Sequence, residues 1–134
     1  MSLTQADADT VRRFYAALAE RDFATAQACF APEAVWHMPG ASPIAGDHHG
    51  WAGIRDGFLA KLGPQSGQTF RAELLDIAIG EEVVVAVQRA TADYQGRSLD
   101  VSGCQLIRIA DGRIVEVRGH YSDQYALDAF WQAG

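Results

Sequence analysis

The chain has 134 residues, of which 49% are hydrophobic and 21% charged, and its formal net charge at pH 7 is −6. This length and composition exclude intrinsic disorder and predict one globular domain over residues 1–134, with a hydrophobic core of ordinary size. The absence of a lysine and arginine cluster argues against a nucleic-acid partner, and the absence of a signal-peptide pattern or a membrane-length apolar run predicts a cytoplasmic protein with no membrane partner.

Amphipathic helices are indicated in the first half of the chain. Thr4 is a suitable N-cap for the first of them. Its apolar stripe, spaced by three and four residues, consists of Val11, Phe14, Tyr15, Leu18 and Ala19. Asp22 can cap a second, short helix, which we expect Pro32 to end. A third helix is indicated by Ile54, Phe58 and Leu62, and Gly63-Pro64 stops it.

The segment "AVWHMPGASPIAGDHHG", between the second and third helices, starts as a strand and continues as a loop. Alternation in the strand Ala34–Met38 places Trp36 and Met38 on one face and His37 on the other. We expect Trp36 and Met38 to form a pocket wall, with plain core packing as the alternative. His37 is expected to make a structural hydrogen bond under the loop.

His48 and His49 lie in the loop that follows. Adjacent side chains point in different directions, and no third ligand stands at a regular spacing, so we expect no metal site. His48 is instead a candidate polar group at the rim of a pocket, and a solvent-facing loop histidine is the alternative.

Four long strands follow residue 69, where the apolar period changes to two. They are Phe70–Ile79, Val83–Asp93, Ser98–Ile109 and Ile114–Tyr121. Short turns separate them, so they should pair antiparallel in chain order, and Asp111-Gly112 is a strong hairpin signal. A closing helix is expected at Asp123–Trp131. Helices followed by a strand meander predict an α+β fold, with a cavity between the helices and a curved sheet.

Polar side chains interrupt the apolar faces of the late strands. Gln105 shares a face with five small or apolar residues, Leu99, Val101, Gly103, Ile107 and Ile109. It therefore either lines a pocket or is a satisfied structural amide. One of Gln88 and Arg89 must also point inward, and we expect Arg89 to pair with a carboxylate such as Asp76 or Asp93.

His120 and Asp123 stand where the last strand meets the closing helix. Asp123 is suited either to capping that helix or to acid/base chemistry. Alternation turns His120 away from the inward face, toward solvent or a partner subunit, unless a bulge at Gly119 reverses the order.

Four stretches, "RRFYAALAERDF", "APEAVWHMPGASPIAG", "DGRIVEV" and "DQYALDAFW", together with the order of elements, resemble the nuclear transport factor 2-like superfamily. Within it the chain is similar to the SnoaL-like group, which is related to polyketide cyclases and ketosteroid isomerases, over roughly residues 8–131. The resemblance implies a cone-shaped α+β fold, with three N-terminal helices packed on a curved, mostly antiparallel sheet. It also implies a deep apolar pocket and a homodimer formed through the outer sheet face.

The resemblance allows a comparison with the catalytic residues of ketosteroid isomerases. The place of their first-helix tyrosine is taken by Phe14, and Tyr15 stands one step away, about 100° around the helix. Their base is an aspartate before a proline, and here Met38 precedes Pro39. Gln105 takes the place of their aspartic acid donor. All three groups are replaced, so a steroid isomerase mechanism is not expected.

SnoaL-like cyclases draw an acid/base aspartate from a region matched here by "EVRGHYSD", which offers His120 and Asp123 unless the position falls on Gly119. We therefore take Asp123 and His120 as candidate proton-transfer groups and Gln105 as the group that polarises a carbonyl. The candidate ligand-binding residues are Phe14, Tyr15, Trp36, Met38, His48, Phe58 and Tyr121.

Our leading hypothesis is a protein that binds a small apolar carbonyl compound, with isomerase, cyclase or hydratase activity by general acid/base chemistry. Two alternatives stay open, a non-catalytic binder of the same fold and a dimeric assembly module whose pocket is filled by its own side chains. A cavity larger than about 300 Å³ with a buried ionisable group favours the enzyme, and a cavity without such a group favours the binder. No cofactor is expected.

Overall fold

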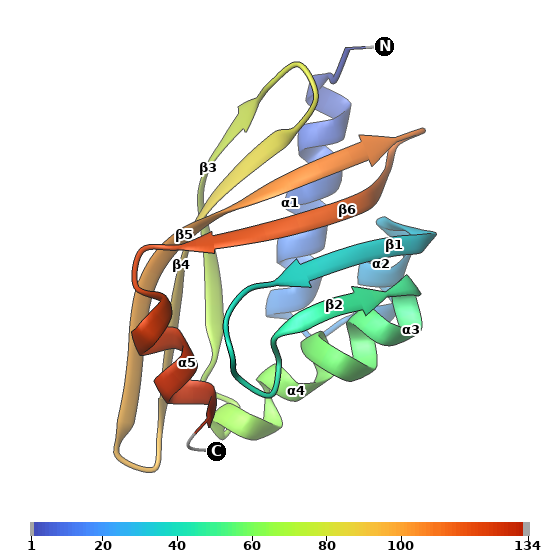
Figure 1. Cartoon of the computed structure of the whole chain (residues 1–134). Helices are drawn as coiled ribbons and strands as arrows, with labels where there is room; N and C mark the ends of the chain where they lie inside the picture. The colour runs from blue at the N-terminus through green and yellow to red at the C-terminus, as the bar shows by residue number, and fades with distance from the viewer. Residues whose placement is uncertain (1, 133–134) are drawn as a thin grey trace.

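Helices dominate the first half of the chain and strands the second half (Figure 1). The structure is a computed structural model and describes residues 2–132. The helical elements are α1 (Gln5–Ala19), α2 (Phe23–Ala28), α3 (Gly50–Ile54), the π-helical turn η1 (Arg55–Leu59), α4 (Ala60–Leu62), the 3₁₀ turn η2 (Pro64–Ser66) and α5 (Gln124–Gln132). The strands are β1 (Phe30–Met38), β2 (Gly46–His49), β3 (Arg71–Ile79), β4 (Val84–Tyr94), β5 (Arg97–Ala110) and β6 (Arg113–Tyr121).

The six strands form one curved sheet in the order β2-β1-β6-β5-β4-β3. All neighbours pair antiparallel except β1 and β6, which run parallel. Two-residue turns join β4 to β5 and β5 to β6, and both residues of each turn have positive φ: 53° and 77° at Gln95 and Gly96, 52° and 77° at Asp111 and Gly112. This is the type I′ geometry that closes tight hairpins, so the predicted meander is confirmed.

The first strand is longer than the sequence pattern predicts, and a second strand follows it. β1 begins at Phe30 and contains Pro32, so Pro32 does not end the preceding helix as we expected. The pairing of β1 with β6 is irregular between Phe30 and Val35, which is where a proline is tolerated in a strand. Residues 46–49, expected as loop, pair with β1 as the short edge strand β2.

Two bulges bend the sheet. Leu74 and Asp76 pair with consecutive residues of β4, so Leu75 has no partner in the ladder and is 52% exposed. Val115 is likewise skipped between β5 and β6, where Arg108 and Ile109 face Glu116 and Ile114. Bulges increase local twist and bend a strand, which suits a sheet that curves around helices.

The helices cover the concave side of the sheet. In Figure 1, α1 runs behind the meander, and α2, α3 and α4 gather beside β1 and β2. The η1 turn has the wider π-helical winding, which lets the consecutive residues Phe58 and Leu59 both be buried, at 5% and 2% exposure. The predicted α+β arrangement, helices on a curved and mostly antiparallel sheet, is confirmed.

Aromatic side chains dominate the core between these layers. The ring centroids of Phe14 and Trp36 lie 5.7 Å apart, and those of Trp36 and Phe58 lie 5.0 Å apart. Burial of such large rings supplies much of the free energy of folding. Within residues 2–132, no helix combines the length and the apolar character that crossing a membrane requires.

Candidate functional site

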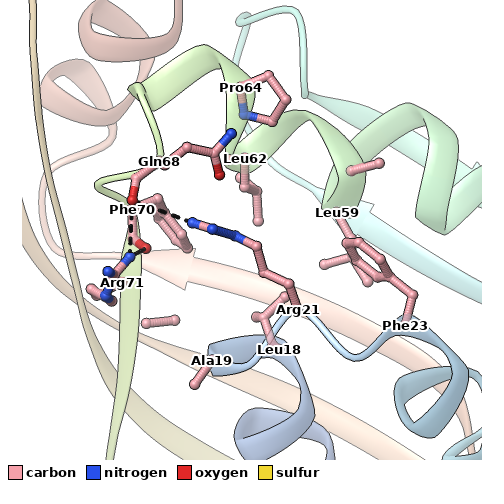
Figure 2. Close-up of a pocket in the computed structure, with 13 residues that line it drawn as sticks. Leu18, Ala19, Arg21, Phe23, Leu59, Leu62, Pro64, Gln68, Phe70 and Arg71 are labelled. Atoms are coloured by element: carbon pink, nitrogen blue, oxygen red, sulfur yellow. Dashed lines mark hydrogen bonds between the residues drawn. The ribbon is translucent and has the colours of Figure 1, made fainter.

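An outer cavity of about 250 Å³ opens where the end of α1, the segment from α4 to η2 and the start of β3 meet (Figure 2). Its apolar walls come from Leu18, Phe23, Leu59, Leu62, Pro64, Phe70 and Ala72. Its polar lining residues are Arg21, Gln68 and Arg71. Figure 2 shows the Arg21 side chain reaching from the turn after α1 across the opening toward Gln68.

An inner cavity of about 20 Å³ lies deeper, between α1 and the sheet. It has room for about one water-sized group. Five of its lining residues, Leu18, Leu59, Leu62, Phe70 and Ala72, also line the outer cavity. A single layer of side chains therefore separates the two spaces.

A third cavity, also of about 20 Å³, lies toward α5. It is lined by Met38, Ile44, Phe58, Leu62, Phe70, Ala90, Tyr121, Leu127 and Trp131. Leu62 and Phe70 thus border all three cavities, and the positions of these two side chains determine how far the cavities are separate.

Polar side chains from four elements meet at the inner cavity. The Tyr15 hydroxyl of α1 donates to the Gln88 amide oxygen of β4. On β5, the Gln105 amide nitrogen donates to the Tyr121 hydroxyl of β6 at 3.0 Å, and that hydroxyl lies 3.8 Å from the Met38 sulfur. These groups are held on helices and strands, which fixes their positions more firmly than loops do.

Two further polar atoms at this cavity are buried without a hydrogen-bond partner among the residues that the structure describes. They are the indole nitrogen of Trp36 and the amide oxygen of Gln105, whose residues are 3% and 2% exposed. An unpaired buried polar group costs about 1–3 kcal/mol. One atom is a donor and the other an acceptor, so a single hydroxyl oxygen of a ligand can pair with both.

The inner cavity is electrically neutral at pH 7. Burial raises the pKa of Tyr121 to about 12, although its hydrogen bond with Gln105 acts in the opposite direction. Burial raises the pKa of Tyr15 as well, and the neighbouring Tyr121 adds to that effect. Both phenols therefore keep their protons. Among residues 2–132, no carboxylate or histidine lines the inner or the third cavity.

Most of the predicted site residues come together around these spaces. Those that line the inner or the third cavity are Phe14, Tyr15, Trp36, Met38, Phe58, Gln105 and Tyr121. Alternation therefore placed Trp36, Met38 and Gln105 on the inward face correctly.

His48 is an exception, because it lines none of the three cavities. Its Nε2 donates to the Ile44 carbonyl at 2.9 Å, and its ring stacks on Phe58 at a centroid distance of 5.8 Å. A Cβ atom at Gly57 would lie 2.6 Å from the His48 Nδ1 atom, so this glycine of η1 makes room for the ring. His48 is a packed structural side chain in the described structure.

Asp123 and His120 line none of these three cavities, although His120 borders an open hollow of about 370 Å³ on the outer sheet face, together with Val87 and Cys104. Asp123 is exposed and caps α5, where its carboxylate accepts the Ala126 N–H at 3.0 Å. His120 is exposed on the outer sheet face opposite Cys104. The register places Gly119 opposite Gln105 without a bulge, so the inward position in this region carries no side chain.

Two side chains on the outer face pair with acids. The ring nitrogens of His37 face Asp47 at 2.6 Å and Glu116 at 2.9 Å, which confirms its structural hydrogen bonding. Arg89 forms two hydrogen bonds with Asp100, at 2.9 and 2.7 Å, so its partner is neither of the two aspartates that we expected. Its neighbour Gln88 is the one that points inward.

Several lining residues were not among the predicted site residues. Gln88 could have been found, because alternation from Val84 places it on the buried face. Leu62 stands in the apolar pattern that predicts the third helix, whereas Arg21, Phe70 and Arg71 carried no such signal. Within residues 2–132, no group of three or more histidine, cysteine, aspartate or glutamate side chains is arranged to hold a metal ion.

Known proteins similar to this chain cover almost all of it. The model of the SnoaL-like domain matches residues 11–117. An uncharacterized protein of Mycobacterium tuberculosis is 35% identical over 130 residues, 94% of this chain and 96% of that protein. The structure of Bal32a, from a soil-derived mobile gene cassette, is 39% identical with a TM-score of 0.91, over 95% of this chain and 97% of that one. An NTF2-like protein from Burkholderia xenovorans shares the fold, with 23% identity and a TM-score of 0.80 over 98% and 99% of the two chains.

Proposed function

Because the chain belongs to the SnoaL-like domain family and has the NTF2-like fold, we propose that it binds a small apolar carbonyl compound in its outer and inner cavities. The outer cavity receives the apolar body of the ligand, and the inner cavity receives its polar end. Ligand pockets are commonly of this kind, apolar with a few convergent polar groups.

The observation that carries this proposal is the pair of unpartnered buried atoms at the inner cavity, the Trp36 indole nitrogen and the Gln105 amide oxygen. The ligand's oxygen accepts from the Trp36 N–H, and in the enol form the same oxygen also donates to Gln105. Each contact replaces an unsatisfied buried group by a hydrogen bond, which is where small ligands gain specificity.

The volumes of the two cavities suit different parts of the proposed ligand. The inner cavity of about 20 Å³ takes one oxygen atom and little else. The ring or chain that carries this oxygen lies in the outer cavity of about 250 Å³, and its entry displaces the shared layer that contains Leu62 and Phe70.

The geometry supports binding more strongly than proton-transfer catalysis. Asp123 and His120, the candidate acid/base groups, lie outside the outer, inner and third cavities, and the ionisable groups of the inner cavity are two tyrosines with raised pKa values. A general base poised near pH 7 is therefore not part of the proposed site. The non-catalytic alternative is our proposal for this chain.

The test is to block the cavities and measure binding of acetophenone and 2-acetylnaphthalene by calorimetry. Ala72 borders both cavities, so Ala72→Phe fills them, while Ala78→Phe places the same ring on the exposed face of the same strand. We expect Ala72→Phe to abolish binding and Ala78→Phe to leave it unchanged. Equal binding by both variants, or no ketone bound by the wild type, would contradict the proposal.

Overpacking can unfold a protein, so a second variant is needed. Gln105→Leu keeps the side chain's size and removes the amide. We expect it to weaken binding of 2-naphthol, whose hydroxyl group donates to Gln105, about tenfold and to leave binding of 2-acetylnaphthalene unchanged, whereas Gln27→Leu, on the exposed surface of α2, changes neither. Thermal unfolding of each variant checks that it is folded.

We further propose that two copies associate through the outer sheet face. Val85 pairs with Leu106 and Val87 with Cys104, which forms a partly exposed apolar strip on that face. Sedimentation of the wild type should show a dimer, and Val87→Lys should sediment as a monomer because it places a charge in the strip. A monomeric wild type would exclude this assembly.

A further inference from the structure

Two arginines meet at the mouth of the outer cavity. The Arg21 Nη2 atom donates to the Gln68 carbonyl at 3.3 Å, and the Arg71 Nη1 atom donates to the same oxygen at 3.2 Å (Figure 2). The greatest possible separation of these two nitrogens is the sum of the distances, 6.5 Å. Arg21 follows α1 and Arg71 begins β3, so the fold itself brings the two positive charges together.

Neither charge is balanced by a neighbouring acid. No ion pair within 4.0 Å involves Arg21 or Arg71 among residues 2–132, and four other basic side chains there, Arg13, Lys61, Arg97 and Arg113, also lack such a partner. None of the residues that line the outer cavity is acidic. The chain as a whole carries a net charge of −6, so two close and unbalanced cations are a local exception. Like charges at this separation repel, and an anion between them removes that cost.

Both guanidinium groups keep donors free for a ligand. Each has five N–H bonds in a planar fork that matches a carboxylate. Arg21 uses one described hydrogen bond, and Arg71 uses two, to the carbonyls of Gln68 and Phe70. The carbonyl bonds orient the two groups without neutralising them.

The backbone conformation of Arg21 is unusual for a residue with a side chain. The α1 helix ends with the Asp22 N–H bonded to the Ala17 carbonyl and the Arg21 N–H bonded to the Leu18 carbonyl. In this motif the residue at position 21 is left-handed, and glycine is the usual choice. Arg21 adopts φ 56°, a conformation that a residue with a Cβ atom enters at a cost, and thereby directs its side chain to the mouth.

We propose that the ligand of these cavities is an apolar carboxylic acid, whose carboxylate binds Arg21 and Arg71 at the mouth. This inference rests on the proposed function, because it names the class of compound that the same cavities bind. The outer cavity of about 250 Å³ lies below the range of about 300–1,000 Å³ typical of drug-sized ligands, so a one- or two-ring acid fits it. An aryl keto acid satisfies both ends, with its carboxylate outside and its carbonyl inside.

The experiment compares 2-naphthoate with the neutral 2-acetylnaphthalene by calorimetry, against wild type, Arg21→Gln and Arg71→Gln. We expect the wild type to prefer the acid about tenfold, and each substitution to weaken acid binding about tenfold while ketone binding stays the same. Arg12→Gln is the matched control, because Arg12 lies on α1 and already pairs with Asp9 at 2.9 Å. Raising the salt concentration should weaken binding of the acid alone.

The outcomes separate this inference from the proposed function. Ketone binding without a preference for the acid, or acid binding that survives both arginine substitutions, overturns the inference and leaves the proposed function in place. No binding of either compound overturns both. A third probe, 2-naphthyl phosphate, identifies the anion, since tighter arginine-dependent binding of this ester than of 2-naphthoate would exclude a carboxylate as the preferred group.

Discussion

Gly119 lies directly opposite Gln105 in the β5–β6 register, and a Cβ atom at position 119 would stand 3.0 Å from the Gln105 amide oxygen. The same atom would lie 3.1 Å from the Tyr121 ring and 3.4 Å from the Pro39 Cδ atom. The missing side chain therefore makes room beside this buried oxygen. Gly119 is also one of the positions at which the resemblance to SnoaL-like cyclases implied an acid, so no carboxylate reaches the cavity here.

The first prediction concerns this contact. Gly119→Ala should lower the free energy of unfolding by about 1–3 kcal/mol, because the Gln105 amide oxygen and the Tyr121 ring would be closer to the new Cβ atom than ordinary packing allows. Urea denaturation measures the change. Gly53→Ala is the control, since its Cβ atom would lie 3.6 Å from the nearest atom and an alanine suits a helix better than a glycine. An unchanged midpoint of urea denaturation for Gly119→Ala would show that the side chains around position 119 accommodate a Cβ atom without cost.

The second prediction separates stability from binding at Arg21. Arg21→Gly should raise the free energy of unfolding by up to about 1 kcal/mol, because glycine adopts φ 56° without steric cost. The same change should weaken binding of 2-naphthoate about tenfold. Arg21→Gln serves as the comparison, and should lose the binding without the gain in stability. A purely structural role for Arg21 predicts the opposite, lower stability with unchanged binding.

The third prediction concerns acid pH and His37. A neutral imidazole has one N–H, so both of its nitrogens can donate to Asp47 and Glu116 only when the ring is protonated. The hydrogen bond from His37 is the main cause that lowers the pKa of each carboxyl group. A lowered pKa in the folded state contributes stability above the unfolded value of about 4, and that contribution is lost as the pH falls further.

His37→Gln should therefore reduce stability at pH 6 and flatten its decline between about pH 5 and pH 3. Denaturant unfolding across this range measures both effects. His120→Gln, an exposed histidine on the same outer face, should match the wild type. Identical pH profiles for wild type and His37→Gln would exclude the linkage.

The fourth prediction concerns alkaline pH and Tyr121. Burial raises the pKa of this phenol to about 12 in the folded state, whereas an unfolded tyrosine titrates near 10. A raised pKa contributes stability below the unfolded value, and the contribution is lost as the pH rises from about 10 toward 12. Tyr121→Phe should therefore lose less stability than the wild type between pH 8 and pH 11. Tyr125→Phe is the control, because Tyr125 is 91% exposed.

Alternation along the strands predicted much of the cavity wall. Trp36 and Gln105 point inward and His120 points outward because strands with one buried face cannot slip by one residue without turning every side chain over. Strand alternation fails at Leu75, where a bulge adds a residue to the strand. Helical spacing likewise fails at η1, where the π-helical turn contains an extra residue. Such irregularities depend on packing between elements, which local spacing does not record.

The short strand β2 could not be predicted from the sequence pattern, for a different reason. Its sequence, Gly46–His49, has loop composition, and it becomes a strand because the free edge of β1 offers hydrogen-bond partners to its backbone. His48, on this strand, packs on Phe58 and does not point to the rim of the cavities described.

Arg21 and Arg71 show a further limit of prediction from the sequence. Arg21 and Gln68 stand 47 positions apart in the chain, and their contact depends on the left-handed turn after α1 and on the path of η2 into β3. A mouth assembled from separate elements leaves no periodic signal. The polar end of the proposed site, by contrast, lies on regular strands and a helix, and most of it could be predicted.

The place of β6 between β1 and β5 has a consequence for biosynthesis. The β1–β2 pair joins the remaining strands of the described sheet through β6, which is the last of these six strands in chain order. The nascent chain therefore cannot complete this sheet before β6 has been made, and closure must bring together β1 and β6, which lie far apart in the chain. Such distant pairing is slow, on the order of milliseconds to seconds. A product that stops before Arg113 would expose two unpaired strand edges, a template for aggregation.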